Sequence, residues 1–173
     1  MFIVDLDQPA PNLSLPDVQG RLHSLLDGHR AIGIVNFWSC ECDLCREIDP
    51  QLEARMADWG GRVRLVTVAV DSDEHRDRLH AAAQTRSTGL FLRDERHTAV
   101  QAYGAQATPH FFVIDTQGIL RYRGAFHNAT FRQRAPTVFY LQDAVNALLA
   151  GQMPPVRQSP AYGCAIVRRE SDG

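Results

Sequence analysis

Three of the four cysteines in this 173-residue chain lie within the short segment of residues 40–45. Cys42 and Cys45 form a Cys-x-x-Cys pair, and Cys40 stands two residues before Cys42. Such a pair suits thiol–disulfide exchange, because one thiolate attacks a disulfide and the second thiol releases the mixed disulfide that results. Four cysteines are too few for a disulfide-stapled scaffold. Their clustering therefore indicates redox or metal chemistry.

The cysteine pair stands where a buried strand is predicted to end and an amphipathic helix to begin. The apolar run of residues 31–38 predicts the strand. A spacing of four predicts a helix over about residues 43–58, with one apolar face made of Leu44, Ile48, Leu52 and Met56. The first turn of a helix stabilises a thiolate, so the pKa of Cys42 is expected below the ~8.5 of a free cysteine. We therefore predict that Cys42 is exposed and attacks, while Cys45, one turn deeper, resolves the mixed disulfide.

The remaining elements must hold this segment in place. The pattern predicts an extended entry over residues 8–20, then a strand at 63–71, a helix at 74–86, a strand at 89–94, a helix at 95–104, a hairpin at 110–126 and a helix at 136–151. Strand–helix–strand connections imply parallel strands, and the hairpin adds antiparallel strands at one edge. The predicted fold class is therefore α/β, with a mixed sheet flanked by helices. We expect one domain over residues 1–151, including an N-terminal extension, and a C-terminal tail over 152–173.

Three segments resemble parts of the thioredoxin superfamily. "VNFWSCECDLCREIDPQL" is similar to its strand–tryptophan–CxxC–helix segment, and "QATPHFFVID" is similar to the segment that carries its cis-proline. "APNLSLPDVQG" ahead of "VNFW" is closer to one branch, the membrane-anchored or secreted thiol-disulfide oxidoreductases and the alkyl hydroperoxide reductase/thiol-specific antioxidant (redoxin) proteins. The resemblance covers roughly residues 9–150 and implies a thioredoxin-like fold.

The resemblance also implies roles around the cysteine pair. Pro109 would be the cis residue packed beside Cys42, and Thr108 would offer backbone groups to an extended substrate. Trp38 would line and shield the site, and Pro50 would kink the active-site helix. The activity implied is that of a dithiol–disulfide oxidoreductase, with a partner dithiol as reductant and without a bound cofactor.

Two residues depart from the pattern of thioredoxin itself. Asn36 stands where that protein has a buried aspartate, so proton transfer to Cys45 must use water or another group. Asp43, at the helix start, favours the helix but opposes a neighbouring thiolate. We therefore expect Cys42 to be less acidic than its counterpart in strongly oxidising relatives.

Three further residues are possible modulators of the site. His110, directly after Pro109, could strengthen the thiolate, although we favour a histidine that begins a strand and points to solvent. Cys40 is expected to stay a reduced small side chain, because pairing with Cys42 or Cys45 would be strained. Cys164, in "PAYGCAIVRR", could fold back as a third redox partner or remain a free cysteine in a docked tail; the sequence leaves both open.

Two alternatives compete with the oxidoreductase prediction. A peroxiredoxin-like thiol peroxidase needs the pattern P-x-x-x-T-x-x-C, but with Cys45 in the cysteine place the other two places hold Cys42 and Trp38. Arg46 and Arg121 could hold an anion, although we expect both to be solvated residues on the surface. The four cysteines could instead hold a structural zinc ion. Zinc sites usually draw ligand pairs from loops, whereas this cluster opens a helix.

Composition excludes several other classes of function. All 18 basic residues are arginine, which leaves no lysine for Schiff-base chemistry, and the formal charge of -2 recruits neither nucleic acid nor acidic membrane. No phosphate-cradling loop or dinucleotide fingerprint is present. The N-terminus lacks the features of a signal peptide, so we expect a cytoplasmic protein acting on protein or small-molecule thiols and disulfides.

Overall fold

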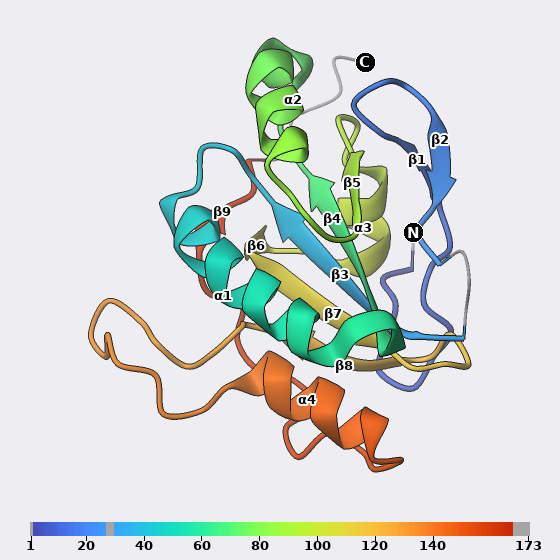
Figure 1. Cartoon of the computed structure of the whole chain (residues 1–173), viewed down its shortest axis with the longest axis vertical. Helices are drawn as coiled ribbons and strands as arrows, with labels where there is room; N and C mark the ends of the chain where they lie inside the picture. Colours follow the sequence, from blue (N-terminus) through green and yellow to red (C-terminus); the bar gives the residue numbers. More distant parts are fainter. Residues whose placement is uncertain (1, 27–29, 168–173) are drawn as a thin grey trace.

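A computed structural model describes residues 2–26 and 30–167 of the chain. Five strands form the central sheet in the order β5-β4-β3-β7-β8 (Figure 1). Their bounds are Ile32–Trp38 (β3), Val63–Ala69 (β4), Leu90–Arg93 (β5), His110–Ile114 (β7) and Leu120–Gly124 (β8). β3, β4 and β5 are parallel, whereas β7 and β8 are antiparallel to their neighbours. The predicted mixed sheet with a hairpin at one edge is therefore confirmed.

Helices cover both faces of the sheet. The described residues form four α-helices, which are α1 (Asp43–Trp59), α2 (Arg76–Gln84), α3 (Thr98–Tyr103) and α4 (Tyr140–Leu149). Figure 1 shows α1 and α4 on one face and α3 on the other. Because successive side chains of a strand point to opposite faces, β3 contributes to a core on each side. Ile34 packs with the α1 and α4 residues, and Phe37 packs with Tyr103 of α3.

α1 begins at Asp43, as predicted, and contains Pro50 in its interior. The final helix differs from the prediction, because α4 starts at Tyr140 instead of residue 136. The amide oxygen of Asn128 accepts hydrogen bonds from the backbone N–H groups of Thr137 (2.9 Å) and Val138 (3.1 Å). These contacts hold the segment before α4 against another loop, so the helix begins one turn later.

Short strands and turns complete the chain. β1 (Ser14–Pro16) and β2 (Leu22–Ser24) form an antiparallel hairpin, and β6 (Ala107–Thr108) pairs antiparallel with β9 (Cys164–Ala165). Two 3-10 turns, η1 (Gly60–Arg62) and η2 (Asp73–His75), precede β4 and α2. Among the described residues, no helix is both long and apolar enough to cross a membrane.

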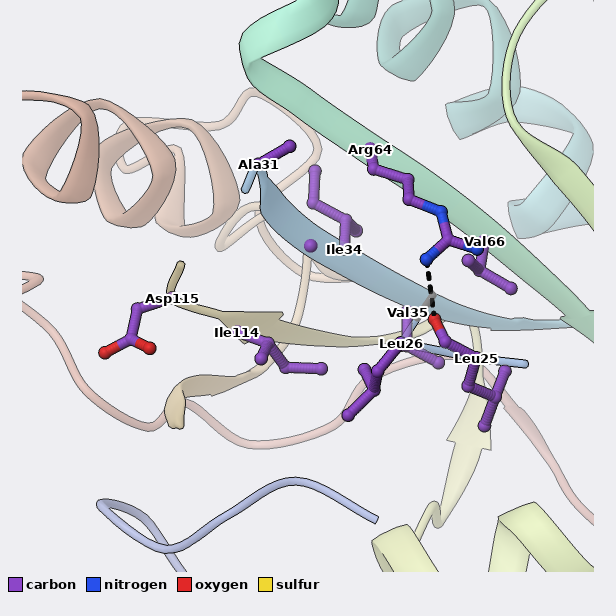
Figure 2. Close-up of a pocket in the computed structure, with 10 residues that line it drawn as sticks. Leu25, Leu26, Ala31, Ile34, Val35, Arg64, Val66, Ile114 and Asp115 are labelled. Atoms are coloured by element: carbon purple, nitrogen blue, oxygen red, sulfur yellow. Dashed lines mark hydrogen bonds between the residues drawn. The ribbon is translucent and has the colours of Figure 1, made fainter. Parts of the chain in front are cut away.

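A small cavity of about 20 Å³ lies at the beginning of β3 (Figure 2). Leu25, Ile34 and Ile114 are among the residues that line it, and the guanidinium of Arg64 donates to the carbonyl oxygen of Leu25 at 3.3 Å. That volume accommodates about one water molecule. Because the cysteines follow the opposite end of β3, this cavity is not part of their site.

Candidate functional site

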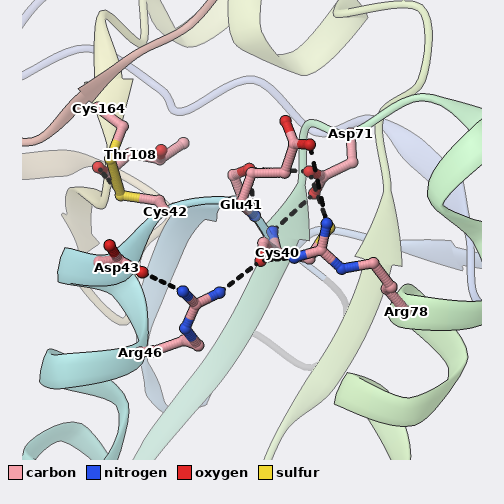
Figure 3. The surroundings of a disulfide bond; sticks show 10 residues. Cys40, Glu41, Cys42, Asp43, Arg46, Asp71, Arg78, Thr108 and Cys164 are labelled. Carbon is pink, nitrogen blue, oxygen red and sulfur yellow. Dashed lines mark hydrogen bonds and ion pairs between the residues drawn. A yellow bond between two sulfur atoms is a disulfide. The ribbon is translucent and has the colours of Figure 1, made fainter.

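Cys42 is the N-cap residue of α1, and its sulfur is bonded to Cys164 of β9 (Figure 3). The two Cα atoms lie 5.9 Å apart across 122 positions of sequence. The structure thus has the folded-back arrangement of the tail, one of the two alternatives that the sequence left open. Cys45, the other member of the Cys-x-x-Cys pair, is a free thiol.

Cys42 is buried, with 1% of its surface exposed, so the prediction of an exposed attacking sulfur is wrong for this state. The cause is the tail, because β9 lies beside the N-terminus of α1 and Cys164 occupies the sulfur. On another side, Cys42 Sγ lies 3.1 Å from the carbonyl oxygen of Thr108. A disulfide sulfur has no proton to donate, so this distance is a contact here and a possible thiol hydrogen bond only after reduction.

Cys45 lies one turn into α1 and is 1% exposed. It packs in an apolar cluster that includes Trp38, Ala69 and Leu79. Burial raises the pKa of its thiol to about 12, against smaller opposing contributions from the backbone of Ser39 and the side chain of Thr108. Cys45 is therefore a neutral thiol in this state and needs a base or a local opening to attack.

Thr108 and Pro109 are joined by a cis peptide bond, as the resemblance implied. Thr108 pairs directly with Cys164, and Ala107 pairs with Ala165. The tail therefore occupies the backbone edge that the resemblance assigned to an extended substrate. A Cβ added at Gly163 would overlap the Thr108 carbonyl, so a glycine before the cysteine permits this close approach.

The segment before Cys164 has its own attachment to the domain. Ser159 Oγ accepts a hydrogen bond from the backbone N–H of Ala125 at 2.9 Å and lies 2.8 Å from the hydroxyl of Tyr122. The backbone N–H of Ser159 donates to the carbonyl of Arg123 at 3.1 Å. Arg157 donates to the carbonyl of Arg121 at 3.0 Å. These contacts place Cys164 near Cys42 independently of the covalent bond.

Trp38 ends β3 and packs in the same cluster as Cys40, Cys42 and Cys45. Its indole N–H donates to the carboxylate of Asp49 at 3.0 Å. A buried Trp N–H normally finds such a partner. The ring is thus fixed in orientation behind the cysteines.

Cys40 is a buried free thiol. Its Sγ lies 3.2 Å from Asp71 Oδ1, and its backbone N–H donates to Asp71 Oδ2 at 3.1 Å (Figure 3). Burial raises the pKa of the Cys40 thiol to about 12, and the neighbouring Asp71 carboxylate adds to this rise. The thiolate form, which any redox step needs, is disfavoured at Cys40.

Asp71 is a site residue that the sequence analysis missed, since it was not among the candidates. It is 7% exposed and also accepts a hydrogen bond from the hydroxyl of Ser39 at 2.8 Å. β3 and β4 are parallel neighbours, so the residues just after each strand meet at one edge. The position of Asp71, two residues beyond β4, was the signal that could have found it.

His110 is 5% exposed, so the favoured prediction of a solvent-facing histidine is wrong. Its ring lies against Phe112, with centroids 4.6 Å apart, and its Nδ1 accepts the backbone N–H of Gln106 at 3.2 Å. Burial lowers the pKa of His110 to about 4, and the positive charge of Arg123 contributes to the decrease. A neutral imidazole supplies no charge to a thiolate at neutral pH.

The two arginines considered as anion-holding groups have other partners in the structure. Arg46 forms an ion pair with Asp43 and donates to the carbonyl of Cys40 at 2.8 Å, whereas Arg121 pairs with Asp115 at 2.7 Å. Within residues 2–26 and 30–167, no group of three or more histidine, cysteine or acidic side chains is placed to hold a metal ion.

The sheet, the cis-proline segment and the cysteine at a helix N-terminus define a thioredoxin-like redox protein of the redoxin branch. The chain belongs to the AhpC/TSA family, whose model matches residues 6–123.

Two curated proteins and one solved structure are similar to this chain. A thiol-disulfide oxidoreductase of Bacillus subtilis, YkuV, is 25% identical over 154 residues, which cover 84% of this chain and 97% of the relative. The thiol:disulfide interchange protein DsbE of Allochromatium vinosum is 28% identical over 126 residues, covering 68% of this chain and 65% of the relative. A crystal structure of a hypothetical protein from Sinorhizobium meliloti superposes with a TM-score of 0.83 and 27% identity, covering 94% of each chain.

Proposed function

We propose that this protein is a thiol–disulfide oxidoreductase in which Cys42 attacks substrate disulfides and Cys45 resolves the mixed disulfide. The observation that carries the proposal is the bond between Cys42 and a cysteine in an extended strand paired with Thr108. That arrangement has the form of a mixed disulfide with a bound peptide, although the peptide here belongs to the same chain.

The proposed reaction proceeds in two exchanges. The Cys42 thiolate, stabilised at the N-terminus of the 17-residue α1, attacks one sulfur of the substrate disulfide. The substrate bond breaks, and the other substrate sulfur leaves as a thiolate that takes up a proton. Cys45 then loses its proton and attacks Cys42 Sγ, which releases the first substrate sulfur as a thiol and leaves a Cys42–Cys45 disulfide.

The side chains and backbone near Cys42 have positioning roles in this proposal. The backbone edge of Ala107 and Thr108 pairs with an extended substrate, as it pairs with β9 in the structure. Trp38 closes the apolar side of the site, where it packs with both thiols of the pair. Protein thiols and disulfides are the proposed substrates, in keeping with the thiol:disulfide interchange activity named for the Allochromatium relative.

A chromogenic peptide tests these assignments. The peptide copies residues 158–167, QSPAYGCAIV, and carries thionitrobenzoate on its cysteine as a mixed disulfide. Reduced Cys164→Ser protein should release thionitrobenzoate when Cys42 attacks, and then release the peptide as a free thiol when Cys45 resolves the adduct.

Two double variants separate the roles. The Cys45→Ser/Cys164→Ser protein should stop at a stable peptide adduct. The Cys42→Ser/Cys164→Ser protein should react at least ~100-fold more slowly, because loss of the helix-stabilised thiolate raises the activation free energy by about 3 kcal/mol or more. Equal adduct formation by both double variants, or by neither, would show that the roles are wrongly assigned.

A further inference from the structure

The two sulfurs of the Cys42–Cys164 disulfide differ in their access to solvent. Cys42 is 1% exposed, whereas Cys164 lies in β9, of which both residues are exposed. A cavity of about 270 Å³ is lined by both cysteines, with Glu41, Asp71 and His75 also on its wall. An external thiol that enters this cavity reaches the disulfide more readily from the Cys164 side.

The two sulfurs also differ as leaving groups. Attack on a disulfide is faster when the expelled thiol has the lower pKa. Cys42 is the N-cap residue of α1, where the backbone N–H groups of the first turn stabilise a thiolate, whereas Cys164 belongs to the two-residue strand β9 and not to a helix. Attack at Cys164, which expels the Cys42 thiolate, is therefore favoured on both counts.

The tail and a substrate cannot occupy the site together. β9 pairs with Ala107 and Thr108, which is the edge that the proposed function assigns to the substrate. The disulfide must therefore be reduced, and the tail displaced, before a substrate strand reaches Cys42. Reduction by a donor and reaction with a substrate are separated in time.

We propose that Cys164 is a third catalytic thiol, the one at which an external dithiol donates its electrons, while Cys42 is the one that meets the substrate. This inference rests on the proposed function, because it takes Cys42 as the attacking sulfur. The donor is identified only by its chemistry, as a dithiol that fits the cavity beside β9.

The electron balance of the donor step is simple. A donor thiolate attacks Cys164 Sγ, the Cys42–Cys164 bond breaks, and its electron pair leaves on Cys42 as a thiolate. The second donor thiolate then attacks its own partner sulfur, which closes the donor disulfide and expels Cys164. Cys164 takes up a proton released by the donor, so one dithiol is oxidised and one disulfide is reduced.

The starting disulfide arises by one internal exchange. After a substrate has been reduced, Cys42 and Cys45 share a disulfide. With the substrate gone, the Cys164 thiolate attacks Cys42 Sγ, and Cys45 leaves and takes up a proton. The burial that keeps Cys45 neutral favours this outcome at equilibrium, and the contacts of Ser159 keep Cys164 within reach.

Brief treatment with a monothiol shows which sulfur of the Cys42–Cys164 disulfide is attacked. Oxidised Cys45→Ser protein is treated briefly with 2-mercaptoethanol, quenched with acid and alkylated, because the serine prevents Cys45 from erasing an adduct on Cys42. Trypsin separates residues 31–46, with Cys40, Cys42 and Cys45 of the native chain, from residues 158–168, with Cys164. We expect at least ~10-fold more mercaptoethanol adduct on the peptide of residues 158–168 than on that of residues 31–46. This ratio corresponds to a difference of about 1.4 kcal/mol in activation free energy between attack at the two sulfurs.

The opposite distribution, or equal adducts on the two peptides, would overturn the proposal. The proposal would also be overturned if these two peptides were not joined by a disulfide in oxidised full-length protein. Oxidised Cys40→Ser protein serves as a control for adducts at Cys40 and should give the same linked peptides. The release of thionitrobenzoate by Cys164→Ser protein reports on the proposed function separately, so the two ideas can fail independently.

Discussion

At the scale of single residues, burial gives His110 a measurable influence on stability. Its pKa is about 4 in the folded chain, below the ordinary value of 6.5, because burial disfavours the imidazolium and Arg123 repels it. Between these two pH values the unfolded chain binds more protons than the folded chain, so the free energy of unfolding rises with pH. The contribution of His110 is complete above pH 6.5 and is lost as the pH falls toward 4.

The prediction is a weaker pH dependence in His110→Phe protein. Wild-type protein should lose up to about 3 kcal/mol more unfolding free energy than the variant between pH 6.5 and 4, the amount that such a difference in pKa supports. Urea unfolding at several pH values measures this, with His80→Phe as a control for a histidine outside this pocket. Parallel pH profiles for wild-type and His110→Phe protein would contradict the assignment.

Cys40 illustrates how burial, together with one neighbouring carboxylate, makes a cysteine unreactive. Its thiol lies against the carboxylate of Asp71, which adds to the effect of burial in raising the pKa to about 12. We predict that Cys40→Ala protein reduces the thionitrobenzoate peptide within about twofold of the unmodified sequence, because a thiol held neutral contributes little to exchange. Both proteins would carry Cys164→Ser in that rate measurement, and a tenfold loss would assign Cys40 a chemical role.

At the scale of elements, the docked strand β9 depends on the absence of a side chain at residue 163. A Cβ there would overlap the carbonyl of Thr108, the residue that pairs with Cys164. We predict that Gly163→Ala weakens the Cys42–Cys164 disulfide about tenfold in a glutathione redox buffer, because overpacking of this kind costs about 1–3 kcal/mol. Mass spectrometry of alkylated samples gives the oxidised fraction.

Gly151 supplies the matched control for that strand. It also has a positive φ, of 72°, but a Cβ added there meets nothing within 4 Å. Gly151→Ala therefore carries backbone strain without overlap at the site. An equal loss of the oxidised fraction in both variants would mean that general destabilisation, and not the docking of β9, governs the disulfide.

The same elements show which parts of the structure the sequence could predict. β3 and β4 are buried on both faces, so each appears as a largely apolar run, and the turn around Gly118 marks the β7–β8 hairpin. β9 has only two residues, both exposed, and its partner lies more than 50 positions away in the chain. Such a pairing has no periodic pattern to reveal it.

The residues of the site also divide into those that the sequence could identify and those that it could not. The motif around Cys42 and Cys45 and the segment around Pro109 were identifiable because their residue types carry the chemistry. The partner of Cys42 could not be decided from sequence, because a disulfide depends on the separation of two Cα atoms in space. The burial of His110 was equally invisible, since it follows from the packing of its ring on Phe112 and its bond to Gln106.

At the scale of the whole molecule, the Cys42–Cys164 disulfide joins the N-terminus of α1 to the C-terminal tail and closes a loop of 122 positions. Closing a loop of this length restricts the unfolded chain and stabilises the folded one by at most about 5 kcal/mol in the chain-entropy model. We predict that the oxidised protein has a higher free energy of urea unfolding than either its reduced form or oxidised Cys164→Ser protein.

Cys40→Ser protein is the control for this comparison, because Cys40 is a free thiol and its loss leaves the disulfide in place. Its oxidised and reduced forms should differ in unfolding free energy by the same amount as those of the wild type. Cys164→Ser protein should lose most of that difference, since a Cys42–Cys45 disulfide closes a far shorter loop and gains less from chain entropy. If wild-type protein unfolded at the same urea concentration in both redox states, the tail would not be joined to the domain through Cys42.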